Sequence, residues 1–154
     1  MNPIALEPLL EKWTQKLRIS PEWSVRLELV DDSNFKKTGD IKIDCTDKKA
    51  VLLLNVHNPM DEKNIEEIIV HELMHLKMYP LDQVTESLIK SNFEVGSAGY
   101  NFAYRTFFEN LEVTVEELAK CFLLEYGENK EISFGRCNNL PTFNDLFKGL
   151  DNLE

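Results

Sequence analysis

The sequence predicts an α+β domain, in which an N-terminal helix and a small three-stranded twisted sheet precede two functionally important helices. Apolar residues recur at helical spacing in the first 18 residues, alternate with polar ones between residues 25 and 56, and return to helical spacing from residue 61. The chain has 154 residues, 43% of them hydrophobic and 29% charged, which is typical of one soluble globular domain. We expect this domain to span residues 1–127, with a C-terminal tail, residues 128–154, packed on or near it.

The N-terminal half contains one expected helix and three expected strands. The helix covers residues 3–18 and ends before Pro21, because proline disfavours a helical conformation at the preceding residue. Residues 25–29 and 41–45 alternate apolar and polar side chains, which is typical of strands with one solvated face. Residues 51–56 are almost all apolar, as expected of a more buried strand.

The C-terminal half is expected to be helical. An apolar stripe runs through residues 61–78, and Pro80 is expected to end that helix. A second, shorter helix is predicted over residues 81–93. A long helix follows over residues 101–126, and a last short helix is indicated at residues 143–150.

Charge and cysteine usage exclude several classes of partner. The chain has 27 acidic and 17 basic residues, a formal charge of −10, and such a surface repels phosphates, so nucleic acid is not an expected partner. No apolar run approaches the ~18 residues of a membrane helix, and the N-terminus lacks the pattern of a signal peptide. Cys45, Cys121 and Cys137 are odd in number and widely spaced, which indicates free thiols in a reducing compartment. We therefore expect a cytoplasmic protein without a membrane partner.

The strongest chemical signal is the segment His71-Glu72-Leu73-Met74-His75, in the middle of the helix expected at 61–78. Histidines four residues apart lie on one helix face, so His71 and His75 can reach one metal ion. Glu72 projects toward the same side, where it can accept a proton from a metal-bound water. This HExxH arrangement of two zinc ligands and a general base is typical of zinc peptidases. The alternative is a helical adaptor without metal, in which both histidines are solvated.

A catalytic zinc ion takes three protein ligands and leaves one position for water, so a third ligand is needed. His57 is one possibility, because it lies between the third expected strand and the motif helix. No HxxGxxH extension follows His75, which excludes a third histidine in that position. The remaining candidates are carboxylates on the later helix, some of which a solvated acidic face also explains: Glu109, Glu112, Glu116 and Glu117.

Residues 23–126 resemble the gluzincin metallopeptidases, which carry HExxH on one helix and a ligating glutamate on a later one. The similarity is greatest to small cytosolic members, the minigluzincins and the ImmA/IrrE-type proteins. It rests on the HExxH segment, the preceding sheet and the sequence EVTVEELA at residues 112–119. The resemblance implies a zincin-like fold and one Zn²⁺ per chain, held by His71, His75 and a downstream glutamate.

The resemblance also favours one glutamate as the third ligand. Family members tend to have a small or apolar residue three positions after the ligand, a polar or acidic residue four after and an apolar residue six after. Counting from Glu112 matches this pattern in full, whereas counting from Glu116 places Lys120, a cation, at the fourth position. Glu112 is therefore the expected ligand, with Glu116 accepting a hydrogen bond from a histidine. The reverse assignment, with Glu116 as the ligand, stays open.

The activity that the resemblance implies is zinc-dependent hydrolysis of a peptide or unfolded protein, with Glu72 as the general base. Similar enzymes often stabilise the oxyanion with a tyrosine or histidine; here Tyr104 is the first candidate and Tyr100 the second, although packing roles explain both. An edge strand of the sheet is expected to pair with the substrate, and residues 41–45 are favoured over 51–56 for this role.

Two further hypotheses concern regulation. The same fold could serve as a zinc-binding regulatory or peptide-binding module with little or no peptidase activity. In the tail, Cys137 could occupy the open position of the metal and hold the site latent, because thiolates are good zinc ligands. A tail that simply packs on the domain, with Cys137 as an ordinary thiol, is the alternative.

Overall fold

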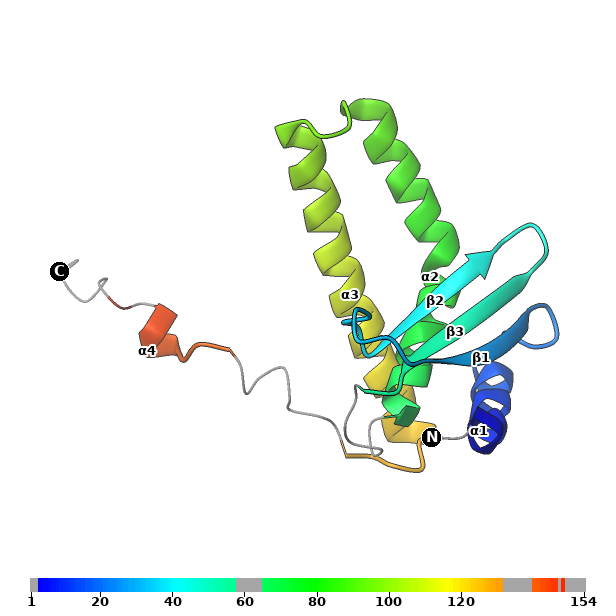
Figure 1. Cartoon of the computed structure of the whole chain (residues 1–154). Helices are drawn as coiled ribbons and strands as arrows, with labels where there is room; N and C mark the ends of the chain where they lie inside the picture. Colours follow the sequence, from blue (N-terminus) through cyan, green and yellow to red (C-terminus); the bar gives the residue numbers. More distant parts are fainter. Residues whose placement is uncertain (1–2, 58–64, 132–139, 147, 149–154) are drawn as a thin grey trace.

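The computed structural model describes residues 3–57, 65–131, 140–146 and 148. These residues form an α+β fold with an N-terminal helix, a three-stranded mixed sheet and two long helices, as the sequence predicts (Figure 1). The elements in chain order are α1 (Pro3–Lys16), β1 (Ser24–Val30), β2 (Gly39–Asp44), β3 (Lys49–Asn55), α2 (Ile65–Asn92), α3 (Ala98–Tyr126) and α4 (Phe143–Leu146).

The sheet has the order β1-β3-β2, with β1 parallel and β2 antiparallel to the central strand β3. Its central position explains why β3 is the most apolar strand, since both of its edges are paired and most of its residues are buried. β2 lies at an edge of the sheet, as expected for residues 41–45. The alternative, residues 51–56, is wrong as an edge because this segment belongs to the central strand.

The hydrophobic core lies between one face of the sheet and the first half of α2. Leu27, Leu52 and Ile41 are neighbours across the three strands, and their side chains pack in the same cluster as Ile69 and Leu73 of α2. α1 contacts both β1 and α2, and α3 packs along α2. The fully buried side chains of this core come from four different elements or their ends: Trp13, Ile19, Leu52, Leu54, Ile69, Val70, Leu73 and Val115.

The expectation that Pro80 ends the motif helix is wrong. α2 continues through Pro80 to Asn92, so the two helices expected at 61–78 and 81–93 are one helix of 28 residues. Proline removes one helical hydrogen bond and crowds the preceding turn. The helix nevertheless continues beside α3, and Ile89 is buried beyond the proline, so even this narrow packing accompanies a helix that passes through Pro80.

The start of α3 also differs from the expected one. α3 begins at Ala98 rather than at about residue 101, and the Ser97 side chain caps it by accepting a hydrogen bond from the backbone N–H of Tyr100 at 3.1 Å. Gly99 therefore lies inside the helix. A Cβ atom at Gly99 would come within 2.8 Å of the Phe93 ring, so glycine permits the close approach of the two helix ends.

Several expectations fall partly or wholly outside the described residues. They are the helix start at residues 61–64, the end of the short helix at residues 147–150, and Cys137 in the tail. The division into a domain at 1–127 and a tail at 128–154 stays a prediction. Within the described ranges, no helix is both long enough and apolar enough to cross a bilayer.

Candidate metal centre

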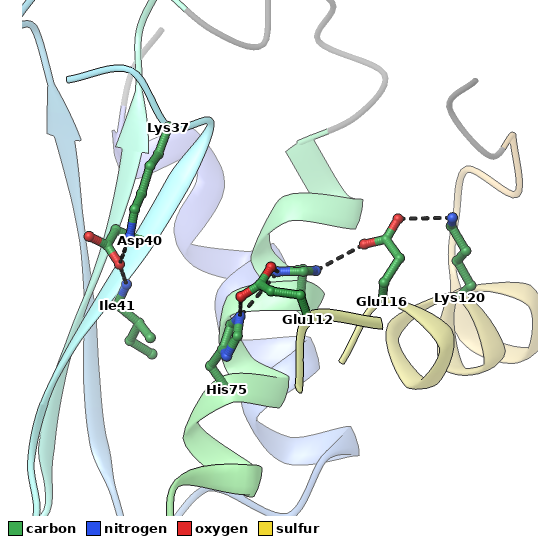
Figure 2. A network of polar contacts seen from close by, with 8 residues as sticks. Lys37, Asp40, Ile41, His75, Glu112, Glu116 and Lys120 are labelled. Carbon is green, nitrogen blue, oxygen red and sulfur yellow. Dashed lines mark hydrogen bonds and ion pairs between the residues drawn. The ribbon is translucent and has the colours of Figure 1, made fainter. Parts of the chain in front are cut away.

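His71, His75 and Glu112 together form a potential metal-binding site. The histidines lie one turn apart on α2, and Glu112 reaches them from α3, which runs alongside (Figure 2). One ligand atom from each residue lies within 4.8 Å of the others. All three side chains are half-buried, so the cluster is neither sealed in the core nor fully exposed to water.

The distances between donor atoms of the three residues fit a transition metal such as zinc. His75 Nε2 lies 3.2 Å from His71 Nε2 and 3.2 Å from Glu112 Oε1. His71 Nε2 lies 3.6 Å from Glu112 Oε2. Tetrahedral coordination with bonds of roughly 2.0–2.1 Å requires ligand atoms about 3.3 Å apart. Two imidazole nitrogens and one carboxylate oxygen are also donors that such ions prefer.

Glu116 contacts the other ring nitrogen of His71. Its Oε2 atom lies 3.0 Å from His71 Nδ1, and its Oε1 atom accepts a hydrogen bond from Lys120 Nζ at 2.8 Å (Figure 2). The hydrogen bond from His71 lowers the pKa of Glu116 to about 2, helped by Lys120 and opposed by burial. An ionised Glu116 holds the proton of His71 on Nδ1, which leaves the Nε2 lone pair facing His75 and Glu112.

In the absence of a metal ion, the cluster holds a proton. Burial lowers the pKa of His71, but hydrogen bonds with Glu112 and Glu116 outweigh it and raise the pKa to about 9. Hydrogen bonds from His71 and His75 hold the pKa of Glu112 well below its usual range. A metal ion must displace this proton, so binding releases protons and strengthens as pH rises.

Glu72 lies on α2, directly after His71. Its side chain is only 7% exposed and faces the start of β2. Burial raises the pKa of Glu72 to about 7, although the nearby His71 and His75 act in the opposite direction. Two further residues act on it: Asp40 of β2 raises the pKa of Glu72, and Lys37, which precedes the strand, lowers it. These two form an ion pair at 3.1 Å (Figure 2). A carboxylate with a pKa near the operating pH is well suited to accept and return a proton.

Several other candidate residues lie away from this cluster. His57 pairs with Asp31, with 2.7 Å between Nε2 and Oδ1, and is not one of the three clustered ligands. Glu109 and Glu117 are exposed.

The tyrosine expected to stabilise the oxyanion also lies away from the cluster. The Tyr104 hydroxyl donates a hydrogen bond to Glu86 Oε1 at 3.0 Å, and its ring stacks on the ring of Tyr100. Tyr104 lies eight residues before Glu112, or ~12 Å along the helix, so the structure does not bring the expected oxyanion donor to the site.

Sequence reasoning missed two residues that shape the site. Gly39 precedes the strand expected at residues 41–45, yet it begins β2, is buried and lies against Glu72. Asn55 is the last residue of β3 and is only 2% exposed, although its neighbours in sequence are apolar. The available signals were weak: a glycine just before an alternating strand, and one amide at the end of an apolar run.

The chain was compared with protein-family models, with curated proteins and with solved structures. None of the three comparisons finds a match.

Proposed function

We propose that the protein is a zinc-dependent peptidase of zincin-like fold, with His71, His75 and Glu112 as metal ligands and Glu72 as the general base. One observation carries the proposal: the buried Glu72, next to His71 in the chain, accompanies three residues whose ligand atoms converge. A purely structural metal site needs no such base and is typically closed by a fourth protein ligand. Among the described residues, the cluster comprises three ligands.

The proposed roles follow from the contacts of each side chain. A bound zinc ion would supply a water of lowered pKa and would polarise the scissile carbonyl. His71 and His75 present Nε2 to the metal position, and Glu116 keeps His71 in the required tautomer. Glu72 is buried on the same face of α2, so its carboxylate can take a proton from the water and return it to the leaving amine.

The substrate class we propose is an extended peptide or an unfolded protein. β2 forms an edge of the sheet, so its outer backbone N–H and C=O groups are available to a further strand. β2 also contacts α2, which carries the histidines and Glu72. A peptide added to this edge would therefore run past the proposed base and metal ligands.

Metal content and hydrolysis of an unfolded protein test the proposal together. Purified protein should contain one equivalent of zinc, and His71→Ala and His75→Ala should lose most of it. His57→Ala is the matched control and should retain zinc, because His57 pairs with Asp31 instead. Glu72→Gln should retain zinc but hydrolyse the substrate ~10²–10⁴-fold more slowly. Full zinc retention by both cluster variants would refute the site.

The free edge of β2 also supports a second candidate, a zinc-containing module that binds peptides without cleaving them. The two candidates differ in the behaviour of the wild-type protein. If wild-type protein with a full equivalent of zinc binds an unfolded substrate and releases no new amino termini, the binding module replaces the peptidase.

A further inference from the structure

We infer that Gly39 is a positioning residue for Glu72: the absence of a side chain at the first residue of β2 lets the Glu72 carboxylate keep its place beside the metal cluster. The inference rests on the proposed function for its catalytic consequence, but the contact itself does not depend on it. Gly39 begins β2, and Glu72 lies on the part of α2 that packs under this strand.

The space that a side chain would need at position 39 is already filled. An ideal Cβ atom there would lie 2.6 Å from Cγ2 of Ile68, 3.0 Å from Oε1 of Glu72 and 3.2 Å from Cγ of Glu72. Ile68 and Glu72 are one turn apart on α2, so the backbone of Gly39 lies directly over this turn. Both side chains are at most 8% exposed, which leaves them little room to move aside.

The requirement for glycine here comes from close approach and not from an unusual backbone conformation. Among the glycines of the described residues, the one with positive φ is Gly96, at 85°. Gly39 instead resembles other strand glycines that allow a neighbouring group to approach the backbone closely.

Asn55 fixes the segment that leads into Gly39. Its buried side-chain amide donates hydrogen bonds to the carbonyls of Phe35 at 2.6 Å and Lys37 at 2.8 Å. The backbone N–H of Asn55 donates to the carbonyl of Thr38 at 3.0 Å. Residues 35–38 are therefore tied to the end of β3, so the segment before Gly39 cannot move away from the central strand without breaking these bonds. We therefore expect a methyl group at position 39 to displace the side chain of Glu72 or Ile68.

The catalytic test is Gly39→Ala. Because a displacement of about 1 Å can cost about 10²-fold in rate, we expect kcat to fall by about 10²-fold. Zinc content should be unchanged, because the three atoms nearest to the added methyl group belong to Ile68 and Glu72 and not to a metal ligand, and KM should change little. A role in folding alone would not produce this separation of kcat from KM and zinc content.

A second variant guards against a failure to fold. Ile68→Leu conserves volume but removes the Cγ2 branch that makes the closest contact. Gly39→Ala/Ile68→Leu should therefore fold, retain zinc and still show a lowered kcat, since its contact with Glu72 remains. Ile68→Leu alone is the reference for this comparison. If the double variant has the kcat of Ile68→Leu alone, the positioning role is refuted.

A measurement without metal or substrate separates this inference from the proposed function. In metal-free protein, we compare the loss of Tm caused by Gly39→Ala in two backgrounds, wild type and Glu72→Ala. The loss should be at least about 2 °C larger in wild type, because Glu72→Ala removes the Cγ and Oε1 atoms that the new methyl group would meet. Equal losses in the two backgrounds would refute the contact, even in an active peptidase. An inactive wild-type protein with unequal losses would refute the proposed function and leave the contact supported.

Discussion

The two halves of the α2–α3 pair differ sharply in burial, although the helices run side by side throughout. We call residues 65–76 of α2 with 111–123 of α3 the sheet-side half, and residues 81–92 with 98–108 the distal half. In the sheet-side half, nine residues of α2 and four of α3 are buried. In the distal half, Ile89 is the one buried residue. Large apolar side chains there are exposed by more than half, including Leu81, Val84, Leu88 and Phe102.

The difference arises because the sheet covers α2 over only part of its length (Figure 1). In the distal half, each helix packs mainly on the other and buries only a narrow stripe. In the sheet-side half, α2 packs against the sheet and α1 as well as α3, so polar side chains such as Glu66 and Glu72 lose most of their water. Desolvation and close charge partners shift pKa values, and the large shifts of His71, Glu72 and Glu116 all lie in this half.

The largest effect on stability is expected at Glu66. Its carboxylate accepts hydrogen bonds from Trp13 Nε1 at 2.8 Å, Lys12 Nζ at 3.0 Å and the backbone N–H groups of Glu128 and Asn129. Glu66→Gln removes the charge and leaves buried donors poorly paired, so we expect a loss of about 3–5 kcal/mol in the free energy of unfolding. Denaturant unfolding measures it.

The matched control in the distal half is Glu86→Gln. Glu86 accepts from Tyr104 and pairs with the exposed Lys90, so its replacement should cost far less. Comparable losses for the two variants would contradict the distinction between the halves.

The Glu66 effect should also depend on pH in a defined direction. Burial raises the pKa of Glu66, but hydrogen bonds from Lys12, Asn129, Trp13 and Glu128 together lower it below 4.5. A carboxylate whose pKa is lower in the folded than in the unfolded state stabilises the protein fully at pH values above its unfolded-state pKa. This stabilisation is lost as the pH falls through its folded-state pKa. The difference between wild type and Glu66→Gln should be constant above pH ~5 and shrink in stronger acid.

A pair of leucines on α2 gives the same comparison without charge. Leu73 is 0% exposed and Leu88 is 59% exposed. Leu73→Ala leaves a cavity in the core and should cost about 2–5 kcal/mol. Leu88→Ala should stay within about 0.5 kcal/mol of wild type, because little of its surface is removed from water. If Leu88→Ala in a monomeric sample loses as much free energy of unfolding as Leu73→Ala, Leu88 is buried within the chain in solution and the distinction between the halves is wrong.

The next effect concerns metal affinity. Glu116→Gln removes the carboxylate that holds the Nδ1 proton of His71 and should weaken zinc binding about 10–100-fold. Glu117→Gln, at the adjacent and exposed position, should leave the affinity unchanged. Competition with a chromophoric chelator measures both. A loss for Glu116→Gln that exceeds the loss for Glu112→Ala would transfer the ligand role to Glu116.

The parts of the fold that the sequence predicts are those that depend on short-range periodicity. Alternation located the strands, and helical spacing placed two histidines and Glu72 on one helix. The acidic residues of the later helix were open as ligands, and the resemblance favoured Glu112 with Glu116 beside it; the structure brings both carboxylates to His71. These features depend on residues a few positions apart.

What the sequence could not reveal depends on contacts between distant segments. Tyr104 is on the same helix as Glu112, but its distance from the site follows from the antiparallel register of α2 and α3, which pairs it with Glu86. The role of Gly39 depends on how closely β2 approaches α2, and the amide of Asn55 depends on where residues 35–38 pass. No local pattern records such distances.

The smallest expected effect is at Pro80, where α2 passes from the sheet-side to the distal half. Pro80 lacks the N–H group that would bond the carbonyl of Leu76, and the helix nevertheless continues to Asn92. Pro80→Ala restores that donor and suits a helix interior, where proline is ~3 kcal/mol less favourable than alanine. The native surroundings are already adapted to proline, so we expect a smaller gain of about 0.5–2 kcal/mol, measured by denaturant unfolding. Zinc content should not change, because Pro80 lies beyond His75. A loss of stability would instead mean that the bend or stiffness at Pro80 is needed to keep the distal half of α2 against α3.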